Sequence, residues 1–555
     1  MAESSQQFSQ DGSPLRIFTN LGPGALVATG LQGRESLNEP YHFTVDLMAP
    51  RESEIPFQRL MGSEVRLELD GPGKDIRHFH GVIAEFSSLG HELDLARYRA
   101  VLAPALCRLA FTRRSRVFQD LAPAEILARA LAPVGGALFR LDTSRRKRDF
   151  RVQFQETDLD FFRRICSEEG YSFFWEHTET AATLVVADRT SVAKSIGPVS
   201  FAPAGRLVAT GPHLREWTLT QRLSVNAVTV QGCHFQLFDR QIDGHAESRV
   251  GTTPGSEALA PLGSLEPSEE NQWSEVHFLD QVTSSGELRD NGLADAFDLQ
   301  EGRARLAAEA AVAGSIRAGG SGICPELQPG CAFQFADHSA QDGLWLSISL
   351  EHQVTVDGRY WLGEKPVLKC LQVLAAAPLS LEQRPWPPLP KPRVQGFVGA
   401  VVIGPEGHQT FVDRYGRVQL RYLWERGEAL AKTSSCWVRV SQSWAGRGYG
   451  AFFWPRIGNE VIVAFEEGDP DRPLVVGSVY NSRNNPPLTL PGNSLAQGFR
   501  TSQGKGDSIG PSHTLVLADG GTDPVVLVQA STAVVMHQEH MRQTSTPNTV
   551  HEMLG

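Results

Sequence analysis

The chain has 555 residues, of which 41% are apolar and 21% are charged, and its formal net charge is -11 at pH 7. This length predicts three or four domains on the usual scale of ~150 residues per domain. The acidic balance leaves no overall positive field, which excludes a general binder of phosphate backbones or anionic lipid. The 52 Gly and 34 Pro are spread along the chain as turn signals and favour many short strands.

The amino-terminal segment lacks the marks of a secretory signal. Its first fourteen residues contain no Lys or Arg and no apolar core. No window of the chain reaches the ~18 consecutive apolar residues of a membrane span. The seven cysteines are odd in number and scattered, which is typical of reduced thiols. We therefore expect a soluble chain that is made in the cytoplasm and, if exported, leaves it already folded.

Strand patterns with a few helices occupy the first 380 residues. Glu64–Asp70 and Trp217–Leu223 alternate apolar and polar side chains, as half-buried strands do. Thr157 begins a capping-box pattern, apolar residues then recur at helical spacing, and Gly170 is placed to stop the helix. A strand is expected to follow at once, from Tyr171.

Three later segments of this region carry other signals. A second helix is expected over roughly residues 300–313, which are rich in Ala. The polar stretch 240–265 and the acidic stretch 265–301 predict surface excursions with loops. The proline-rich stretch 383–391 predicts a semi-rigid spacer.

Beyond the spacer, strands and turns follow one another at short intervals. In Gly416–Leu423 the apolar residues alternate with Arg417, Gln419 and Arg421, which predicts a strand with one wet face. Glu460–Phe465 is apolar on both faces and favours a central strand. About five short strands without a helix predict a small closed barrel.

The carboxyl-terminal segment changes character at Asn484. It begins as a linker and then holds two short apolar runs, which start at Leu515 and Val525. Each run is too short to bury itself, and three chains wound together would supply partners for every strand edge. We therefore expect a trimeric stem.

Some residues are metal ligands by type. His78 and His80 share one face of a strand, but no third ligand is evident, and Cys324 and Cys331 have an unusual spacing for zinc. Surface histidines and buried thiols are the favoured interpretation. The chain also contains no HExxH, GxSxG or Walker motif, so we expect neither an enzyme nor a cofactor.

A different argument applies to His537, His540 and His551. On a threefold axis, one inward histidine would supply three ligands without any motif. An axial metal in the stem is therefore a hypothesis, although solvated histidines near a frayed terminus are favoured over it.

Two further clusters leave alternatives open. The stretch 108–164 holds 13 Arg and Lys against 7 Asp and Glu, which indicates a solvated loop by default or, more specifically, a contact with a baseplate or tube partner. Aromatic residues concentrate in the expected barrel, where core and trimer contacts are favoured over stacking with nucleic acid bases. They are Trp437, Trp444, Tyr449, Phe452, Phe453 and Trp454.

Several long motifs resemble the VgrG family, the spike proteins of the bacterial type VI secretion system. Residues 453–481 include FWPRIGNEV, GDPDRP and GSVYN, and residues 413–418 read DRYGRV. The stretches DFFRRI from Asp160 and EEGYSFF from Glu168 resemble the helix-to-strand motif of the family's amino-terminal region. The motif residues to which the resemblance assigns a structural role are Tyr415, Gly416, Arg417, Trp437, Trp454, Pro455, Arg456, Gly458, Glu460, Gly468, Asp469, Pro470, Arg472, Pro473, Gly477, Tyr480 and Asn481.

The resemblance implies a mainly β fold with a few helices, related to contractile-phage tail hubs and spikes. Two tube-like or hub-like β-barrel domains, an OB-like β-barrel and a short trimeric β-helical stem are expected. The boundaries we predict are 1–14 for a disordered amino terminus, 15–210 and 211–382 for the two barrel regions, 383–393 for the linker, 394–481 for the OB-like domain, 482–512 for a second linker and 513–555 for the stem.

The implied function is mechanical. A homotrimer would cap an Hcp-like tube, puncture a target membrane by transient contact, and carry a PAAR-repeat tip protein with effector and adaptor proteins. It would also meet baseplate components, bind no nucleic acid, and leave the cytoplasm without a signal peptide. Only about 70 residues follow the barrel, so we expect a short stem and a separate toxin. A prophage baseplate hub and, from another class, a peptidoglycan-degrading enzyme are the alternatives.

Overall fold

The computed structural model describes residues 8–71, 75–92, 94–142, 145–148, 150–190, 193–203, 211–225, 227–247, 269–273, 294–358, 364–385, 389–425, 435–504, 510–520 and 524–531. The chain divides into two compact units. The first comprises residues 1–397, 424–438 and 464–474, and the second comprises residues 398–423, 439–463 and 475–555. Each unit is described by itself.

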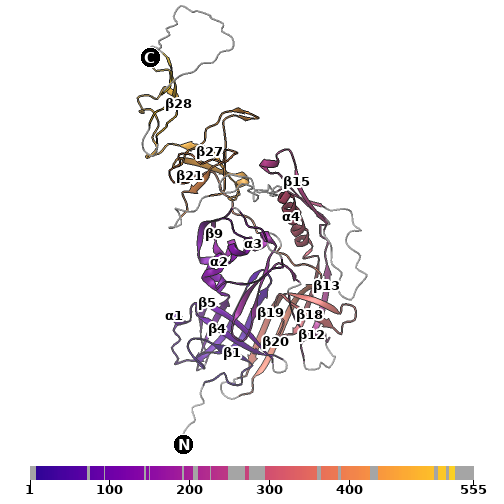
Figure 1. The fold of residues 1–555 in the computed structure, drawn as a ribbon. Coiled ribbons are helices and arrows are strands. Elements are labelled where there is room, and N and C mark those ends of the chain that lie inside the picture. Colours follow the sequence, from indigo (N-terminus) through magenta and orange to yellow (C-terminus); the bar gives the residue numbers. More distant parts are fainter. Residues whose placement is uncertain are drawn as a thin grey trace, which may run out of the picture. The chain divides into compact units, whose positions relative to one another are not determined.

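Two six-stranded barrels share one continuous sheet in the first unit (Figure 1). The strands of the first barrel, in sheet order, are β1 (Leu15–Phe18), β4 (Glu64–Asp70), β5 (Ile76–Glu92), β6 (Leu95–Ala103), β3 (Glu39–Pro50) and β2 (Val27–Ser36). Those of the second are β19 (Gly343–Asp357), β18 (Cys331–Ala336), β12 (Lys194–Phe201), β13 (His213–Gln221), β17 (Ile316–Ile323) and β20 (Val367–Pro378). Strand β20 also pairs with β19 and so closes the second barrel.

Antiparallel pairing of β2 with β19 joins the two barrels. The predicted alternation of Glu64–Asp70 is confirmed, because β4 has these bounds and buries Val65, Leu67 and Leu69 in the first barrel. Strand β12 lies before the expected boundary at residue 210, yet it pairs with β13 and β18. The second barrel therefore begins before that boundary.

Short elements between the barrels pack on the core of the first barrel. The helices are α1 (Phe57–Leu60), the 3-10 turns η1 (Ala105–Phe111) and η2 (Ala132–Val134), α2 (Pro123–Leu131) and α3 (Asp158–Glu169). The strands form two small sheets, β7 (Arg113–Phe118) with β9 (Arg151–Thr157), and β10 (Ser172–His177) with β11 (Ala182–Ala187) and β8 (Leu138–Arg140).

Helix α3 begins and ends where the sequence predicts. The Thr157 hydroxyl accepts a hydrogen bond from the Asp160 amide at 3.0 Å, which satisfies one of the free N–H groups of the first turn. Gly170 has a φ of 70°, a left-handed conformation that ends the helix. Strand β10 then starts at Ser172, one residue after the predicted start.

The region predicted as surface excursions contains a small sheet and a helix. The sheet consists of β14 (Ala227–Gly232), β15 (Ile242–Glu247) and β16 (Glu269–Trp273), and a 3-10 turn, η4 (Phe235–Leu237), precedes β15. Helix α4 (Ala294–Val312) begins earlier than expected and packs on this sheet, burying Val228, Val230, Ala304 and Ala308. The loop prediction for residues 240–247 is therefore wrong, because this polar strand is stabilised by pairing with β14.

The described part of the proline-rich spacer packs against the first unit. Gln383 is buried, and the Arg384 guanidinium pairs with Glu309 at 2.7 Å and donates to the Gly170 carbonyl at 2.9 Å. These contacts hold the beginning of the spacer in place.

The OB-like region forms a five-stranded sheet. Its order is β22 (Gln419–Tyr422), β21 (Val398–Ile403), β26 (Glu460–Phe465), β27 (Pro473–Val479) and β23 (Arg439–Val440), so the predicted central place of Glu460–Phe465 is confirmed. A short hairpin, β24 (Ala445–Gly446) with β25 (Tyr449–Gly450), and a 3-10 turn, η8 (Glu466–Gly468), complete the region. Val418, Leu420 and Tyr422 are buried as predicted.

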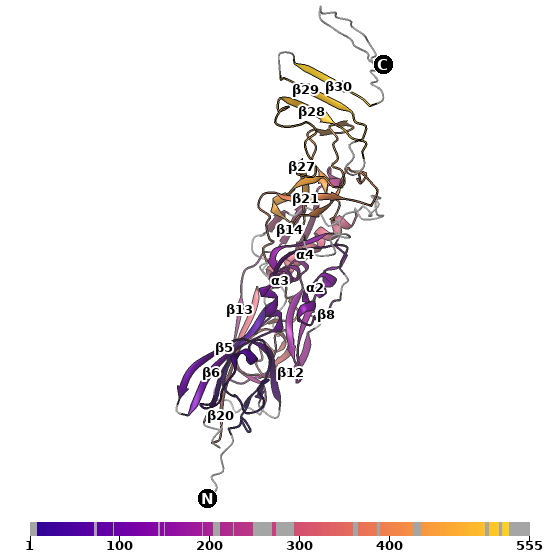
Figure 2. The same ribbon diagram turned by 90° about the vertical axis from the view of Figure 1, so that its left-hand side faces the viewer.

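The last described strands form an antiparallel meander that we call the tip sheet (Figure 2). It consists of β28 (Ala496–Arg500), β29 (Thr514–Ala518) and β30 (Val525–Gln529). The strands pair within one chain, and the trimeric β-helical stem stays a prediction. Across the described ranges, every helix is too short or too polar to cross a bilayer.

Candidate functional site

One face of the tip sheet is apolar and open to solvent. The register places Phe499, Leu515 and Val528 in one cross-strand row, and Gln497, Leu517 and Val526 in the next. The five apolar side chains of these rows are 41% to 67% exposed. A contiguous face of this kind marks a contact surface, because one chain leaves it in water.

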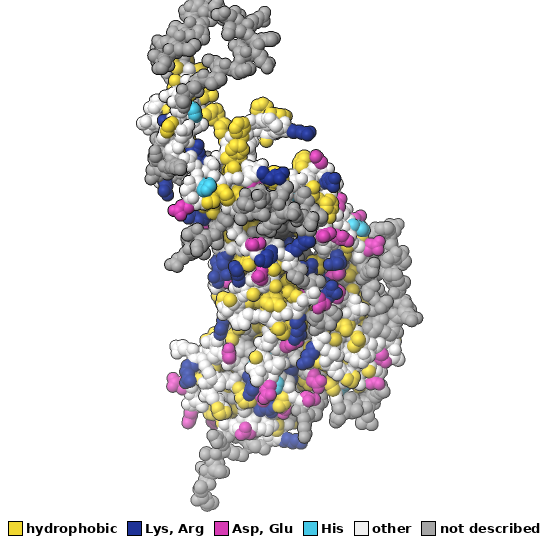
Figure 3. Space-filling model, viewed as in Figure 1, with side chains coloured by type: hydrophobic (Ala, Val, Ile, Leu, Met, Phe, Trp, Pro, Cys, Tyr) yellow, Lys and Arg dark blue, Asp and Glu magenta, His cyan; other side chains and the backbone are white. Residues whose placement is uncertain are grey.

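Aromatic side chains also lie at the surface of the second unit. Figure 3 shows exposed hydrophobic side chains, drawn in yellow, in this part of the chain. Trp444 and Tyr449 pack edge to face, and Phe453 stacks on Phe499 of the tip sheet with ring centroids 5.3 Å apart. In contrast, Trp437, which belongs to the first unit, is buried. The surface group consists of Trp444, Tyr449, Phe452, Phe453 and Trp454, which are 44% to 70% exposed.

Asp413 organises the turn that contains Tyr415, Gly416 and Arg417. Its carboxylate accepts hydrogen bonds from the Tyr415 and Arg417 amides and from Arg417 Nε, at 2.7 to 2.9 Å. Arg417 is therefore buried, and its predicted place on a wet strand face is wrong. Gly416 has a φ of 71°, and a Cβ there would overlap the indole of Trp454. This glycine is thus required both by its backbone conformation and by the tryptophan.

The motif around Pro455 forms a second turn. The Arg456 amide donates to Asn459 Oδ1 at 2.8 Å, and Gly458 has a φ of 88°. At the start of β26, Glu460 Oε2 accepts a hydrogen bond from Asn481 Nδ2 at 2.6 Å. This bond ties two motif residues that are separated by the β27 strand, whereas Tyr480 is 63% exposed.

The remaining motif residues form the loop between β26 and β27, which groups with the first unit. Gly468 has a φ of 77°, and the Asp471 amide donates to Asp469 Oδ1 at 3.0 Å. The Asp471 carboxylate accepts a hydrogen bond from the Val152 amide of β9 at 2.7 Å. Pro470 and Arg472 complete this loop, Pro473 begins β27, and Gly477 lies within that strand.

The basic stretch 108–164 contributes strands and helices to the first unit, so its default interpretation as a solvated loop is wrong, and part of its charge is paired. Arg114 and Arg116 pair with the buried Asp158. Arg140 pairs with Glu176 at 2.7 Å, and further arginines of the stretch pair with glutamates of α3. Arg108, Arg113, Arg129, Arg146 and Lys147 are exposed, so a contact of this stretch with a partner stays a prediction.

A buried charged cluster links the two barrels. The Arg77 guanidinium donates to Glu35 at 2.8 Å, and His352 Nε2 donates to the same carboxylate at 2.9 Å. Gln372 Nε2 lies 3.1 Å from His352 Nδ1, so both nitrogens of that ring have a polar partner. The residues lie on β2, β5, β19 and β20, so the cluster holds both barrels in register.

The protonation states of this cluster follow from its burial. Burial alone would raise the pKa of Glu35, but Arg77, His352 and His177 outweigh it and lower the pKa to about 2. His177 is affected in the opposite sense by the same environment: burial, followed by the charge of Arg77, lowers its pKa to about 3. Its Nδ1 accepts a hydrogen bond from the His80 amide at 3.1 Å. At neutral pH the cluster thus holds a carboxylate and an uncharged His177.

The metal-ligand candidates that the structure describes have other contacts. His78 Nδ1 lies 3.9 Å from Glu68, His80 Nε2 lies 2.8 Å from the Thr178 carbonyl, and the Cys324 thiol donates to the His213 carbonyl at 3.4 Å. Burial raises the pKa of Cys331 to about 11. No group of three or more candidate ligands occurs within the described residues. His537, His540 and His551 lie outside them, so the axial metal stays a hypothesis.

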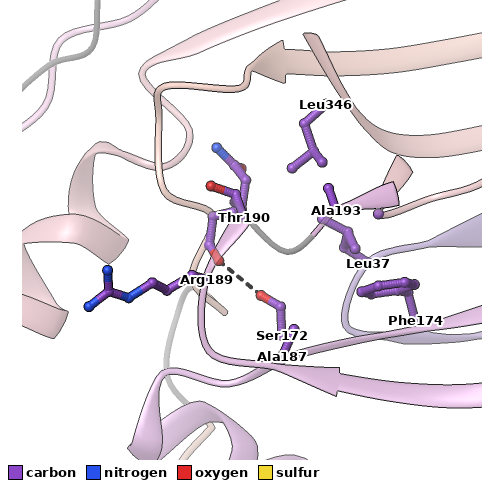
Figure 4. Close-up of a pocket in the computed structure, with 10 residues that line it drawn as sticks. Leu37, Ser172, Phe174, Ala187, Arg189, Thr190, Ala193 and Leu346 are labelled. Atoms are coloured by element: carbon purple, nitrogen blue, oxygen red, sulfur yellow. Dashed lines mark hydrogen bonds between the residues drawn. The ribbon is translucent and has the colours of Figure 1, made fainter. Parts of the chain in front are cut away.

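Two of the cavities in the described part of the first unit differ strongly in size. The smaller, about 20 Å³, is lined by Leu37, Phe174 and Leu346, and the Ser172 hydroxyl beside it donates to the Gln383 carbonyl (Figure 4). It has room for about one water molecule. The larger is a cleft of about 900 Å³ between the first barrel and the β10–β11 sheet.

Sequence reasoning did not assign roles to several of these residues. Asp413 and Asp471 lie inside recognised motifs, and their position before a turn was an available signal. Arg77 and His352 carried no such signal, because their partners are distant in sequence.

Two known protein families match this chain, each over a different part of it. The phage tail baseplate hub (GPD) family matches residues 34–358, and the type VI secretion system/phage-baseplate injector OB domain matches residues 410–480. VgrG1a of Pseudomonas aeruginosa, a type VI secretion system spike protein, is 29% identical over 506 residues, which cover 89% of this chain and 73% of VgrG1a. The actin cross-linking toxin VgrG1 of Vibrio cholerae is 31% identical over 87% of this chain.

The chain spans only part of these relatives. It covers 66% of VgrG1c and 63% of VgrG1b of Pseudomonas aeruginosa, and 43% of the Vibrio cholerae toxin. Among solved structures, the fold is similar to the Escherichia coli c3393 protein, a type VI secretion component, with a TM-score of 0.55 and 18% identity over 84% of this chain and 99% of that one. It is also similar to a PdpA–VgrG complex chain, with a TM-score of 0.53 and 7% identity over 91% and 94%.

The hub match alone covers more than half of the chain, and the motif turns fall in the matched OB domain or its loop. The protein therefore belongs to the phage tail baseplate hub family, together with the VgrG spike proteins of type VI secretion.

Proposed function

We propose that three copies of this chain assemble into a spike whose hub caps an Hcp-like tube. The observation that carries the trimer is the apolar face of the tip sheet, which is exposed in one chain. Threefold symmetry would turn three such faces toward a common axis and remove them from water. The surface aromatic group supports further contacts between copies, because aromatic residues are enriched in buried interface cores.

Two lysines on the apolar face test this assembly. Val526 and Val528 share that face, and Val525 lies on the opposite face of the same strand. We expect the double variant Val526→Lys and Val528→Lys to elute as a monomer, because the charges would have to be buried without partners. Val525→Lys is the matched control and should keep the trimer. A double variant that stays trimeric by light scattering would contradict this interface.

The further partners extend the proposal. The trimer would carry a PAAR-repeat tip protein, effector and adaptor proteins, meet baseplate components, and touch a target membrane transiently without binding nucleic acid. It would assemble in the cytoplasm and be translocated out of the cell by the secretion apparatus. The spike names of the relatives support this role.

Translocation can be measured in a bacterium that has a working secretion apparatus but lacks its own spike gene. We expect the chain and the tube subunit to appear together in the medium. The Val526→Lys, Val528→Lys variant should abolish both, and Val525→Lys should retain both. Tube protein in the medium without the chain would argue against the proposed role.

The alternatives make different predictions. A prophage tail hub would be encoded beside tail and capsid genes rather than secretion genes. We propose that the chain is a structural component rather than an enzyme, since it belongs to the tail baseplate hub family. A clearing zone in a peptidoglycan zymogram would overturn this part of the proposal.

A further inference from the structure

Arg151 on β9 lies at the centre of a set of buried ion pairs in the first unit. Its side chain is 2% exposed and its guanidinium lies 2.7 Å from Glu168, 2.8 Å from Asp471 and 3.7 Å from Glu169. Glu168 and Glu169 end helix α3, which runs directly after β9. Two of the three anions are thus local, and the third comes from a distant part of the chain.

The distant anion is presented by a preorganised loop. The Arg472 amide donates to the Asp469 carbonyl at 2.9 Å, and the Glu466 amide donates to the Arg472 carbonyl at 3.0 Å. These bonds close the loop on itself. Asp471 then accepts from Arg151 with one oxygen and from the Val152 amide with the other. This two-point contact specifies both the position and the orientation of the loop.

A third segment completes the contact. Lys391, at the end of the proline-rich spacer, lies 2.9 Å from Asp469 and 3.7 Å from Asp471. Beside it, the Val394 amide donates to the Gly468 carbonyl at 2.8 Å. We call the whole set the ion lattice. Its cations are Arg148, Arg151, Arg164, Lys391 and Arg472, and its anions are Glu156, Glu168, Glu169, Asp469 and Asp471.

The charges of the lattice depend on one another. Burial would raise the pKa of Glu168, but Arg151, Lys391 and Arg164 outweigh it and hold the pKa below its usual value. For Arg303, burial, with the charges of Arg148 and Arg151, lowers the pKa to about 9. Around Arg151 itself, Glu168 and Asp471 outweigh its burial and raise its pKa, so removing Asp471 would leave a buried positive charge with less compensation.

We propose that the ion lattice is a lock that holds the loop between β26 and β27 in the hub and releases it only as a whole. A buried ion pair adds little net stability compared with an apolar contact, but it is favourable in only one geometry. If any central partner is lost, the remaining charges stay buried without compensation in a medium of low polarity. Partial release of the loop is therefore disfavoured.

Hydrogen exchange of the full chain tests the lock. Asp471→Asn keeps an oxygen that can accept from Val152 but removes the charge, whereas Asp471→Ala removes both. We expect both variants to exchange about tenfold faster in the peptides covering 464–474 and 150–157, with the two peptides losing protection together. Asp46→Asn, which breaks the exposed pair with Arg99, is the control and should leave both peptides unchanged.

A milder variant keeps the test informative if Asp471 variants do not fold. Lys391 is 32% exposed, so Lys391→Met should fold and accelerate exchange about threefold in the same two peptides, as expected for an edge ion pair. Wild-type protection in Asp471→Asn, or loss of protection in only one of the two peptides, would overturn the lock. So would an unchanged Lys391→Met.

Discussion

The carboxylate of Asp471 lies 2.8 Å from the guanidinium of Arg151, although the two residues are 320 positions apart in the chain. Both are almost completely buried, with side chains 1% and 2% exposed. The contact brings a loop of the OB-like sheet into the hub unit. The contact therefore explains why the GDPDRP motif contains Asp471, since its carboxylate neutralises a buried cation.

Replacing Arg151 should be strongly destabilising. In Arg151→Met, Glu168 and Asp471 lose their shared cation in a buried site, and we expect a loss of about 3–5 kcal/mol in unfolding free energy. Arg99→Met is the control, because the exposed Arg99–Asp46 pair should contribute at most about 1 kcal/mol. Thermal unfolding followed by calorimetry compares the two variants, and equal effects would show that burial of the pair is not decisive.

Lowering the pH should reduce the unfolding free energy of the barrels before most carboxylates become protonated. The pKa of His177 is lowered to about 3 from 6.5, so between these values the unfolded chain binds a proton that the folded chain does not. Stability then falls as pH falls, by up to ~1.4 kcal/mol per pH unit. Glu35, with its pKa lowered from 4.5 to about 2, adds a loss of the same sign below pH 4.5.

The change in melting temperature between pH 7 and pH 5 isolates the contribution of His177. His177→Asn keeps an acceptor for the His80 amide but cannot titrate, so the variant should show a shallower decrease than the wild type. His91→Asn, at an exposed position, should keep the wild-type slope. Identical slopes in the His177 variant and the wild type would exclude His177 as the source.

Alanine substitutions at two glycines separate the cost of backbone strain from the cost of side-chain overlap. Gly416 and Gly407 both have left-handed φ values, of 71° and 82°, but only at Gly416 would a Cβ meet another side chain, the indole of Trp454. We expect Gly407→Ala to cost about 1 kcal/mol and Gly416→Ala to cost clearly more. Denaturant midpoints measure both. Equal costs would mean that Trp454 moves away freely.

Local signals in the sequence predicted the elements whose causes are local. Thr157 and Gly170 mark the ends of α3, because a cap and a left-handed residue act within a few positions. The alternation in Glu64–Asp70 predicted β4 for the same reason. The family motifs predicted the OB-like domain, and the apolar residues on both faces of Glu460–Phe465 predicted its central strand.

Features that depend on contacts between residues distant in sequence could not be predicted in this way. Arg417 was assigned to a wet face from its alternation, but Asp413 draws it into a buried turn. Strand β15 is polar, and it forms because β14 and α4 are there to receive it. Arg151 looked like one of many surface cations, since neither its burial nor its partner Asp471 is visible in the stretch that contains it.

The mass of the assembly in solution tests the central claim most directly. One chain has a mass of 60.7 kDa, and sedimentation or light scattering at micromolar concentration should give three times that value. This result is expected because the tip sheet exposes an apolar face that association of three copies would cover. A stable monomer under these conditions would contradict the proposed spike.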